Sequence, residues 1–81
     1  MTTMRAKFQV NTVTIFQSGY EQLKMNAVPK SNAYPADGSD EDNTYAKFSP
    51  VGELSLTIAN PALHGKFKPG DRFYIDFTPA S

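Results

Sequence analysis

The chain contains no cysteine, and this one absence excludes three kinds of site. Without thiols there can be no disulfide, no thiolate-bound metal and no cysteine nucleophile. The chain has 81 residues, and a domain of this size buries only about 60% of its unfolded surface, so its stability has to come from a compact apolar core. We therefore expect a single small domain over residues 1–81, suited to a reducing compartment.

Net charge and long apolar runs are also lacking. Eight lysine and arginine residues balance eight aspartate and glutamate residues, so no overall field draws the chain to nucleic acid or to an anionic membrane. No apolar run is longer than three residues, and the start of the chain, Met1–Arg5, lacks the apolar segment of a signal peptide. Neither a membrane-spanning segment nor a membrane partner is expected.

The apolar residues near the start of the chain alternate with polar ones, as in strands with one buried face. Residues 4–15 form the longest such stretch, but within it the apolar positions change from even to odd numbers. This change predicts a bulge or bend near Asn11 and Thr12, which keeps the same face inside. Residues 22–27 alternate again after a turn, so the two stretches predict a hairpin.

Three more strands and one helical turn are predicted in the second half. Residues 45–48 and 53–58 predict a second hairpin around a proline-containing turn. Asn60–Pro61 predicts the start of a helical turn, because asparagine can accept hydrogen bonds from the first free amides and proline has none to offer. Pro69–Gly70 predicts a type II turn, and residues 72–77 alternate as a final strand.

Five strands with a helical turn between the fourth and fifth is the order of an SH3-like barrel. We therefore predict an all-β, five-stranded SH3-like barrel with one short helical turn before the last strand, and an OB-like barrel or a small β-sandwich is the alternative. The predicted core consists of Ala6, Phe8, Val10, Leu23, Met25, Ala27, Phe48, Leu54, Leu56, Ile58, Leu63, Phe67, Phe73, Ile75 and Phe77.

Residues 29–43 form a long polar loop that carries four of the eight acidic residues, all of them between Asp37 and Asp42. An EF-hand would need glycine at its sixth position and glutamate at its twelfth, and neither is present, so no metal site is predicted. Clustered charge on a long loop is instead typical of a recognition surface. The residues predicted to bind a protein partner are Tyr34, Asp37, Asp40, Glu41, Asp42 and Tyr45.

The constellations of nucleophilic and metal catalysis are missing. His64 is the only histidine, and no Gly-x-Ser-x-Gly run or glycine-rich phosphate loop occurs. A small domain also has little wall for a pocket that excludes water. We expect no enzymatic activity, no catalytic residue and no cofactor.

Single-stranded nucleic-acid binding is the alternative function. It would use Tyr45, Lys47, Arg72 and Tyr74, because aromatic rings stack on bases while nearby cations neutralise phosphates. Zero net charge and an acidic loop argue against it.

Several motifs resemble a group of small proteins of unknown function from tailed bacteriophages and prophages. They are Asp40–Thr44, Ser49–Pro50, Asn60–Ala62, Phe67–Gly70 and Phe73–Phe77. The resemblance implies a phage accessory or virion protein, located in the host cytoplasm or in the virion, and it carries over no catalytic residue. The predicted function is thus a non-enzymatic, phage-encoded binding module acting through protein–protein interaction, as a virion or assembly accessory or as a host-interacting, anti-defence-type factor. Self-association is a further prediction, since outward tyrosines are favoured at interfaces.

Overall fold

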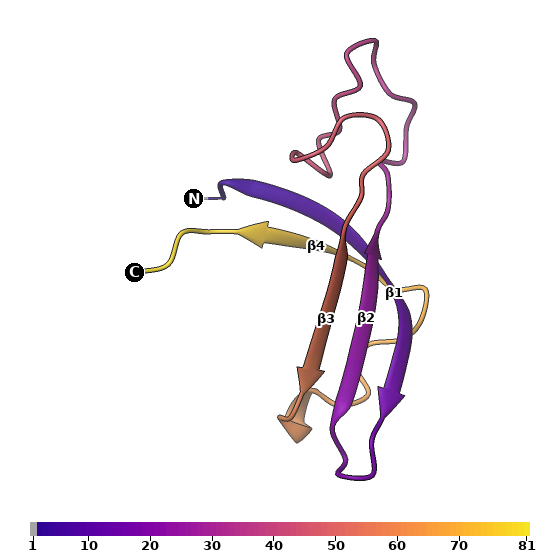
Figure 1. Ribbon diagram of the computed structural model, residues 1–81, viewed down its shortest axis with the longest axis vertical. Coiled ribbons are helices and arrows are strands. Elements are labelled where there is room, and N and C mark those ends of the chain that lie inside the picture. The colour runs from indigo at the N-terminus through magenta and orange to yellow at the C-terminus, as the bar shows by residue number, and fades with distance from the viewer. Residues whose placement is uncertain (1) are drawn as a thin grey trace.

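One antiparallel sheet forms the fold in the computed structural model, which describes residues 2–81. Its elements are strands β1 (Met4–Ile15), β2 (Glu21–Ala27) and β3 (Glu53–Ile58), a 3-10 turn η1 (Pro61–Leu63) and strand β4 (Arg72–Phe77) (Figure 1). The strand order is β3-β2-β1-β4, which makes β3 and β4 the two edges. The all-β class and the helical turn before the last strand are therefore confirmed.

Strand β1 pairs with two neighbours along different parts of its length. Met4–Gln9 pairs with β4, whereas Phe8–Ile15 pairs with β2. The register with β2 shifts between Val10 and Thr12, which leaves Asn11 as the extra residue of a bulge. This confirms the bend predicted from the change of apolar phase, and Figure 1 shows the two ends of β1 running in clearly different directions.

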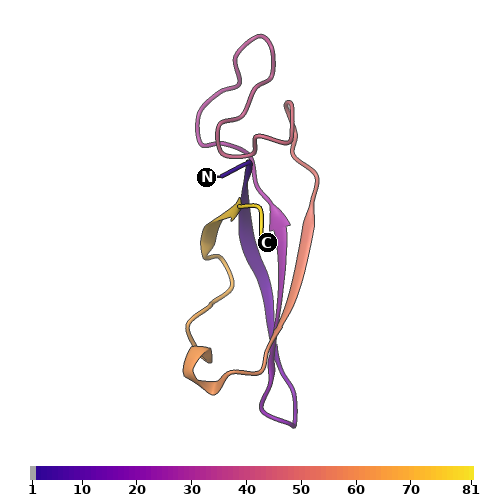
Figure 2. The same ribbon diagram turned by 90° about the vertical axis from the view of Figure 1, so that its left-hand side faces the viewer.

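The connection from β3 to β4 has the local structure that its residues predict. The side chain of Asn60 accepts a hydrogen bond from the amide of Ala62 at 3.0 Å, as an N-cap does. The turn before β4 closes with a bond of 3.0 Å from the amide of Asp71 to the carbonyl of Lys68. Gly70 has φ +96° there, a conformation that a residue with a side chain rarely adopts. In Figure 2 this connection carries the chain from β3, on one side of the β1–β2 pair, to β4 on the other.

The core lies on one face of the sheet, where directly paired residues share a side. Phe8 is paired with Ala27 on β2 and with Phe73 on β4, and Val10 is paired with Met25. We call this side the apolar face. Its members are Met4, Ala6, Phe8, Val10, Val13, Ile15, Glu21, Leu23, Met25, Ala27, Leu54, Leu56, Ile58, Phe73, Ile75 and Phe77. The buried apolar residues are Ala6, Phe8, Val10, Leu23 and Met25, all of which were predicted to be in the core.

The predicted second hairpin is wrong. Strand β3 pairs with β2, and among residues 2–81 the segment 45–48 takes part in a single isolated bridge, between Lys47 and Ser39. The physical reason is visible at Phe48, whose φ of +60° lies outside the range of an extended strand. Four strands therefore form instead of five, and the sheet that they form is open within the part of the chain described.

Four residues predicted to lie in the core are instead 44–52% exposed. Leu56 and Phe77 belong to the edge strands, where a neighbour is present on one side, while the other two lie outside the sheet. These four residues are Phe48, Leu56, Leu63 and Phe77. Alternation along a strand identifies the apolar face, but it does not say whether anything covers that face.

Replacing the buried Leu23 by alanine should lower the free energy of unfolding by about 2–5 kcal/mol, because it removes a packed side chain and leaves a cavity. Leu63→Ala is the matched control, since this leucine lies on η1 and is 44% exposed. Leu63→Ala should lower the free energy of unfolding by less than half as much as Leu23→Ala does. Urea denaturation followed by circular dichroism measures both values, and equal losses would contradict the burial described.

Candidate functional site

The long loop is folded against β1 at the point where β2 ends. The amide of Val28 donates to the carbonyl of Lys7, and the amide of Thr44 donates to the carbonyl of Arg5, both at 2.9 Å. In the other direction, the amide of Lys7 donates to Asn43 Oδ1 at 2.8 Å and that of Arg5 donates to Thr44 Oγ1 at 2.9 Å. Residues from the loop therefore continue the hydrogen bonding of β1 beyond the last residue of β2.

Asn43 is the central residue of this junction and is fully buried. Its side-chain oxygen accepts from Lys7, while its Nδ2 donates to the carbonyl of Val28 at 2.7 Å and to Asp40 Oδ2 at 3.1 Å. Both amide hydrogens and the oxygen thus have partners, which removes the penalty of burying a carboxamide. The residue holds three separate segments together.

The carboxylate of Asp40 is also buried, at 3% exposure, and is surrounded by donors. Its Oδ1 accepts from the amides of Asp42 and Asn43, and its Oδ2 accepts from the amide of Lys30 and the side chain of Asn43. Desolvation alone would raise the pKa of Asp40, but the bond from the Asn43 side chain and the three backbone donors outweigh it, so the pKa is lowered. The charged form is therefore part of the folded loop.

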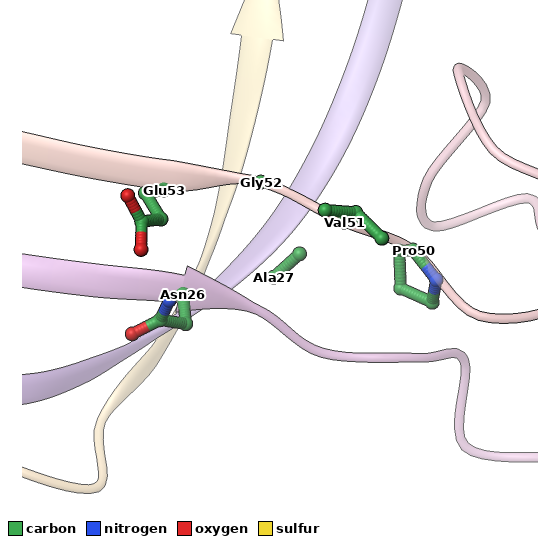
Figure 3. A pocket seen from close by; sticks show the side chains of 6 residues that line it. All are labelled: Asn26, Ala27, Pro50, Val51, Gly52 and Glu53. Carbon is green, nitrogen blue, oxygen red and sulfur yellow. The ribbon is translucent and has the colours of Figure 1, made fainter.

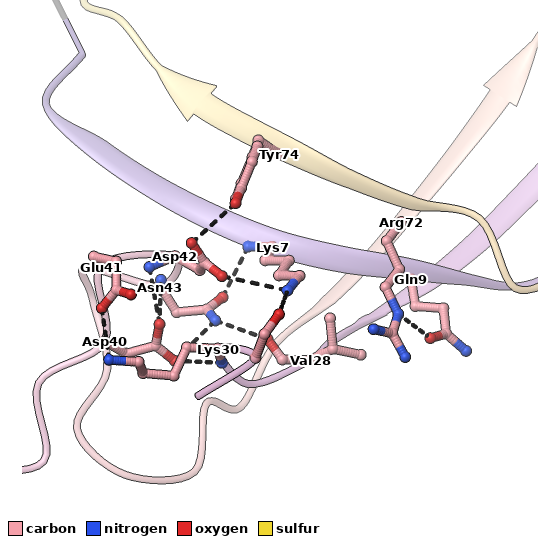
Figure 4. A network of polar contacts seen from close by, with 11 residues as sticks. Lys7, Gln9, Val28, Lys30, Asp40, Glu41, Asp42, Asn43, Arg72 and Tyr74 are labelled. Atoms are coloured by element: carbon pink, nitrogen blue, oxygen red, sulfur yellow. Dashed lines mark hydrogen bonds and ion pairs between the residues drawn. The ribbon is translucent and has the colours of Figure 1, made fainter. Parts of the chain in front are cut away.

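Asp42 links the loop to the polar face of the sheet (Figure 4). Its Oδ2 lies 3.3 Å from Lys7 Nζ, an ion pair in which both side chains are largely buried. Its Oδ1 accepts a bond of 3.0 Å from the hydroxyl of Tyr74 on β4. This hydrogen bond and the charge of Asp42 raise the pKa of Tyr74. Lys7 also donates to Ser31 Oγ at 3.2 Å, so its ammonium group contacts the loop at two points.

Arg5 and Asp76 form a second charged group on the same face. Arg5 Nε and Nη2 donate to the two carboxylate oxygens of Asp76 at 2.7 and 3.2 Å. The Arg5 guanidinium also lies over the ring of Tyr74, 4.5 Å from its centroid. Hydrogen bonding to Arg5 lowers the pKa of Asp76, and the same bond raises the pKa of Arg5.

The remaining predicted partner-binding residues lie at different places on the loop. Asp37 is exposed and accepts a bond from the amide of Ser39, which lowers its pKa. Glu41 is 66% exposed at its side chain and pairs with Lys30 at 2.9 Å. The predicted acidic surface is thus divided: Asp37 and Glu41 face solvent, whereas Asp40 and Asp42 hold the loop in place.

The aromatic residues of the loop pack against one another. The rings of Tyr34 and Phe48 meet edge to face at 5.8 Å. A Cβ on Gly38 would lie 2.4 Å from the Phe48 ring, so glycine is required for this contact. The hydroxyl of Tyr34 is buried and has no hydrogen-bond partner among the described residues. Burial raises the pKa of Tyr34.

The residues of the nucleic-acid alternative are divided between the two faces of the sheet. Arg72 and Tyr74 point from β4 on the polar face, where Arg72 Nε donates to Gln9 at 2.9 Å. The hydroxyl of Tyr45 instead lies beside Phe8, which belongs to the apolar face. Both groups surround Gly52, where an added Cβ would be 3.2 Å from the hydroxyl and 3.1 Å from the Phe8 ring. The aromatic pair predicted for base stacking is therefore not brought together.

A shallow open hollow lies where β2 and β3 meet the loop (Figure 3). Its lining offers one carboxylate, from Glu53, and one carboxamide, from Asn26, beside Ala27, Pro50, Val51 and Gly52. This set contains neither a nucleophile with an adjacent base nor a pair of carboxylates. In residues 2–81 no group of three or more histidine, aspartate or glutamate side chains could hold a metal ion, and no helix is long and apolar enough to cross a membrane.

The apolar face is buried at its centre and exposed at its margins. Leu56 on β3 and Phe77 on β4 are 50% and 48% exposed, and Ile15 at the end of β1 is 69% exposed. The radius of gyration is 14.5 Å, whereas a compact chain of this length would have about 12 Å. The chain is therefore more extended than a compact domain of its length.

Sequence reasoning missed the buried polar residues. Lys7 and Asn43 belong to the loop junction, and Glu21 accepts from the amide of Gly65 at 3.0 and 3.3 Å, which ties the η1 connection to β2. The burial of Glu21 could have been predicted, because it lies on the same side of its strand as the apolar Leu23 and Met25. The asparagine and the lysine carried no comparable signal.

Comparison of the chain with protein-family models, with curated protein sequences and with solved structures finds no match. The resemblance to small phage proteins therefore stays a prediction.

Replacing Asn43 by aspartate should lower the free energy of unfolding by at least about 2 kcal/mol, because it removes two donors and places a second carboxylate against Asp40. Asn60→Asp is the matched control, since this side chain only accepts a bond and aspartate is an equally good N-cap. Its effect should be close to zero. Thermal and urea unfolding measure the stability of both variants. If Asn43→Asp were as stable as Asn60→Asp, the hydrogen bonds of Asn43 would not hold the loop to the sheet.

Stability should fall in acid. Because the pKa of Asp40 is lower in the folded chain than its ordinary value of 3.8, the charged carboxylate stabilises the fold above that pH, and this contribution is lost as the pH falls through the lowered pKa. The lowered pKa values of Asp37, Glu41 and Asp76 act in the same direction. Asp40→Asn should be less stable at pH 7 and should lose less between pH 5 and 2. Urea titrations across that range measure the stability of the wild type and of Asp40→Asn as a function of pH. If the two stabilities fell in parallel, the charged carboxylate of Asp40 would not be what stabilises the fold.

Proposed function

We propose that the chain is a non-enzymatic binding module that acts through protein–protein interaction, and that the apolar face of its sheet is the binding surface. The observation that carries this proposal is the exposure of Leu56 and Phe77 at the two edges of that face. An exposed apolar surface continuous with a core is characteristic of a site that a protein partner covers.

The polar loop supports a different role from the one predicted. Asp40 and Asp42 are engaged within the domain, so their charges contribute little to a partner. Glu41 and Asp37 remain available at the surface and can add charge complementarity beside the apolar contact. The loop fixes one end of the sheet, and the apolar face provides the area for binding.

We infer that the sheet is related to an SH3-like barrel. The first strand pairs with both the second and the last, and a helical turn precedes the last strand, which is the connectivity of that fold. The predicted strand at 45–48 is the element not formed, so β3 keeps one free edge in the described residues. A strand supplied from outside the chain would take the place of the missing strand beside β3.

The biological setting follows from the phage resemblance alone. We propose a virion or assembly accessory, or a host-interacting factor of the anti-defence type, located in the virion or in the host cytoplasm. An exposed apolar face is compatible with both settings, because each requires a stable contact with another protein.

Single-stranded nucleic-acid binding is the second candidate, favoured by one observation. Arg5 lies over the exposed ring of Tyr74, and Arg72 lies two residues away on the same face of β4. Against this, the Arg5 guanidinium is held by Asp76 and the Tyr74 hydroxyl is held by Asp42, which places two carboxylates beside the proposed phosphate site.

A tagged chain incubated with nuclease-treated host lysate should retain a protein partner, and Phe77→Ser together with Leu56→Ser should abolish the capture by making the apolar face polar. Arg72→Ala on the opposite face is the control and should leave capture unchanged. Fluorescence anisotropy with a labelled oligothymidine tests the second candidate. Binding to that strand which Tyr74→Ala and Arg72→Ala both remove, with no nuclease-resistant capture, would replace the proposed function by the alternative.

A further inference from the structure

The outer edge of β3 offers a row of backbone groups with no strand beside them in residues 2–81. The amide of Ala27 donates to the carbonyl of Gly52 at 3.0 Å, which fixes the phase of the β2–β3 ladder. In an antiparallel pair, the backbone amide and carbonyl of successive residues point alternately toward the neighbouring strand and away from it. Glu53, Ser55 and Thr57 therefore direct their amides and carbonyls toward the open edge.

This edge lacks the features that keep strands from pairing. Strand β3 reads Glu-Leu-Ser-Leu-Thr-Ile, with no proline, lysine or arginine, and its regular register with β2 contains no bulge. The other edge strand, β4, carries Arg72 and Asp76. Of the two edges, β3 is the one that accepts another strand without burying a charge in the middle of the pair.

The surface area shows that the chain is more extended than a compact monomer of its mass. The accessible surface is 5633 Å², whereas a compact monomer of 8.9 kDa would expose about 4800 Å². The excess of about 800 Å² equals the share of one partner in a standard protein interface.

We propose that the partner of the free β3 edge is a second copy of this chain, whose β3 pairs antiparallel with β3 around a two-fold axis at Ser55. The inference rests on the proposed function, because the pairing extends the apolar face at its β3 edge. In this register Glu53 lies opposite Thr57 of the second copy, and Ser55 lies opposite Ser55. All three outward-facing residues of each strand form hydrogen-bonded pairs, and no like charges meet.

The side chains support the same register. Leu54 lies opposite Leu56 of the second copy on the apolar face, so each half-exposed Leu56 side chain gains an apolar neighbour on the side where β3 has none. Because the contact is isologous, it closes on itself and yields a dimer instead of a fibre. The dimer contains one continuous sheet of eight strands, two times the four of each chain, with the charged β4 strands at its outer edges.

Ser55→Glu tests the register directly. Within one chain Ser55 lies opposite Lys24 on β2, so glutamate gains an opposite charge there and the monomer fold is preserved. Across the proposed axis the two glutamates face each other, which should raise the dissociation constant of the dimer at least about fivefold. Ser55→Lys should weaken the dimer as well, although it also sets two lysines opposite each other within one chain. Mixing the two variants should restore a heterodimer, which is the result that separates the two effects.

Sedimentation equilibrium over a range of concentrations measures the mass of the whole chain. We expect the wild type to reach twice 8.9 kDa, and Thr14→Glu, on the polar face of β1 away from this edge, to do the same. A second variant, Ser55→Pro, removes an outward amide at an edge position that tolerates proline, and it should be monomeric with an unchanged circular dichroism spectrum.

The outcomes separate this inference from the proposed function. A wild type that stays monomeric at all concentrations overturns the self-pairing, and so does a dimer whose affinity Ser55→Glu, Ser55→Lys and Ser55→Pro all leave unchanged. If the chain is monomeric but still captures a host or phage protein in a manner that depends on Leu56 and Phe77, the self-pairing fails and the proposed function stands. If neither contact occurs, both fail.

Discussion

The fold depends on the backbone of β1, which must satisfy two different neighbours in succession. One stretch of it is bonded to β4 and the other to β2, and the bulge at Asn11 turns the strand between them. Because a bulge moves the side chains after it by one position, the apolar face stays continuous through the bend. Beyond the end of β2, Asn43 and Thr44 take over as partners of β1, so a side chain performs what a strand would otherwise do. The order of the sheet and the position of the loop both follow from this shared strand.

Patterns of local origin were readable from the sequence. The bulge followed from the change of apolar phase, the cap at Asn60 from its chemistry, and the turn at Gly70 from the need for positive φ. The strand pairing of β3 was not readable, because a turn containing Pro50 is compatible with a hairpin and only the tertiary structure shows that β3 lies beside β2 instead. Exposure at Leu56 was unreadable for a similar reason, since alternation reports a face and not its cover.

The acidic loop shows why charge alone is a weak guide to function. Four neighbouring carboxylates look alike in the sequence, yet Asp40 and Asp42 are largely buried among donors from the rest of the chain, whereas Asp37 and Glu41 keep only local partners and face water. What separates Asp40 from Asp37 is its proximity to Asn43 and to the amide of Lys30, and both contacts depend on how the loop closes. The two faces of the sheet therefore differ in character. Hydrogen bonds and ion pairs cover part of the polar face, whereas the apolar face is buried at its centre and exposed at both edges.

The pairing of β1 with β4 also affects how the protein emerges from the ribosome. Met4 is matched to Phe77 and Gln9 to Arg72, so β1 is completed by a strand that is made much later. Contacts so distant in sequence form late and slow the folding of a small domain. Until β4 has been made, the edge of β1 that pairs with it and the apolar side chains of β1 stay exposed to other chains, including nascent chains on neighbouring ribosomes. A cell that makes many copies from one message would therefore need the hairpin of β1 and β2 to form early, since it is the local element able to shield part of that face before β4 exists.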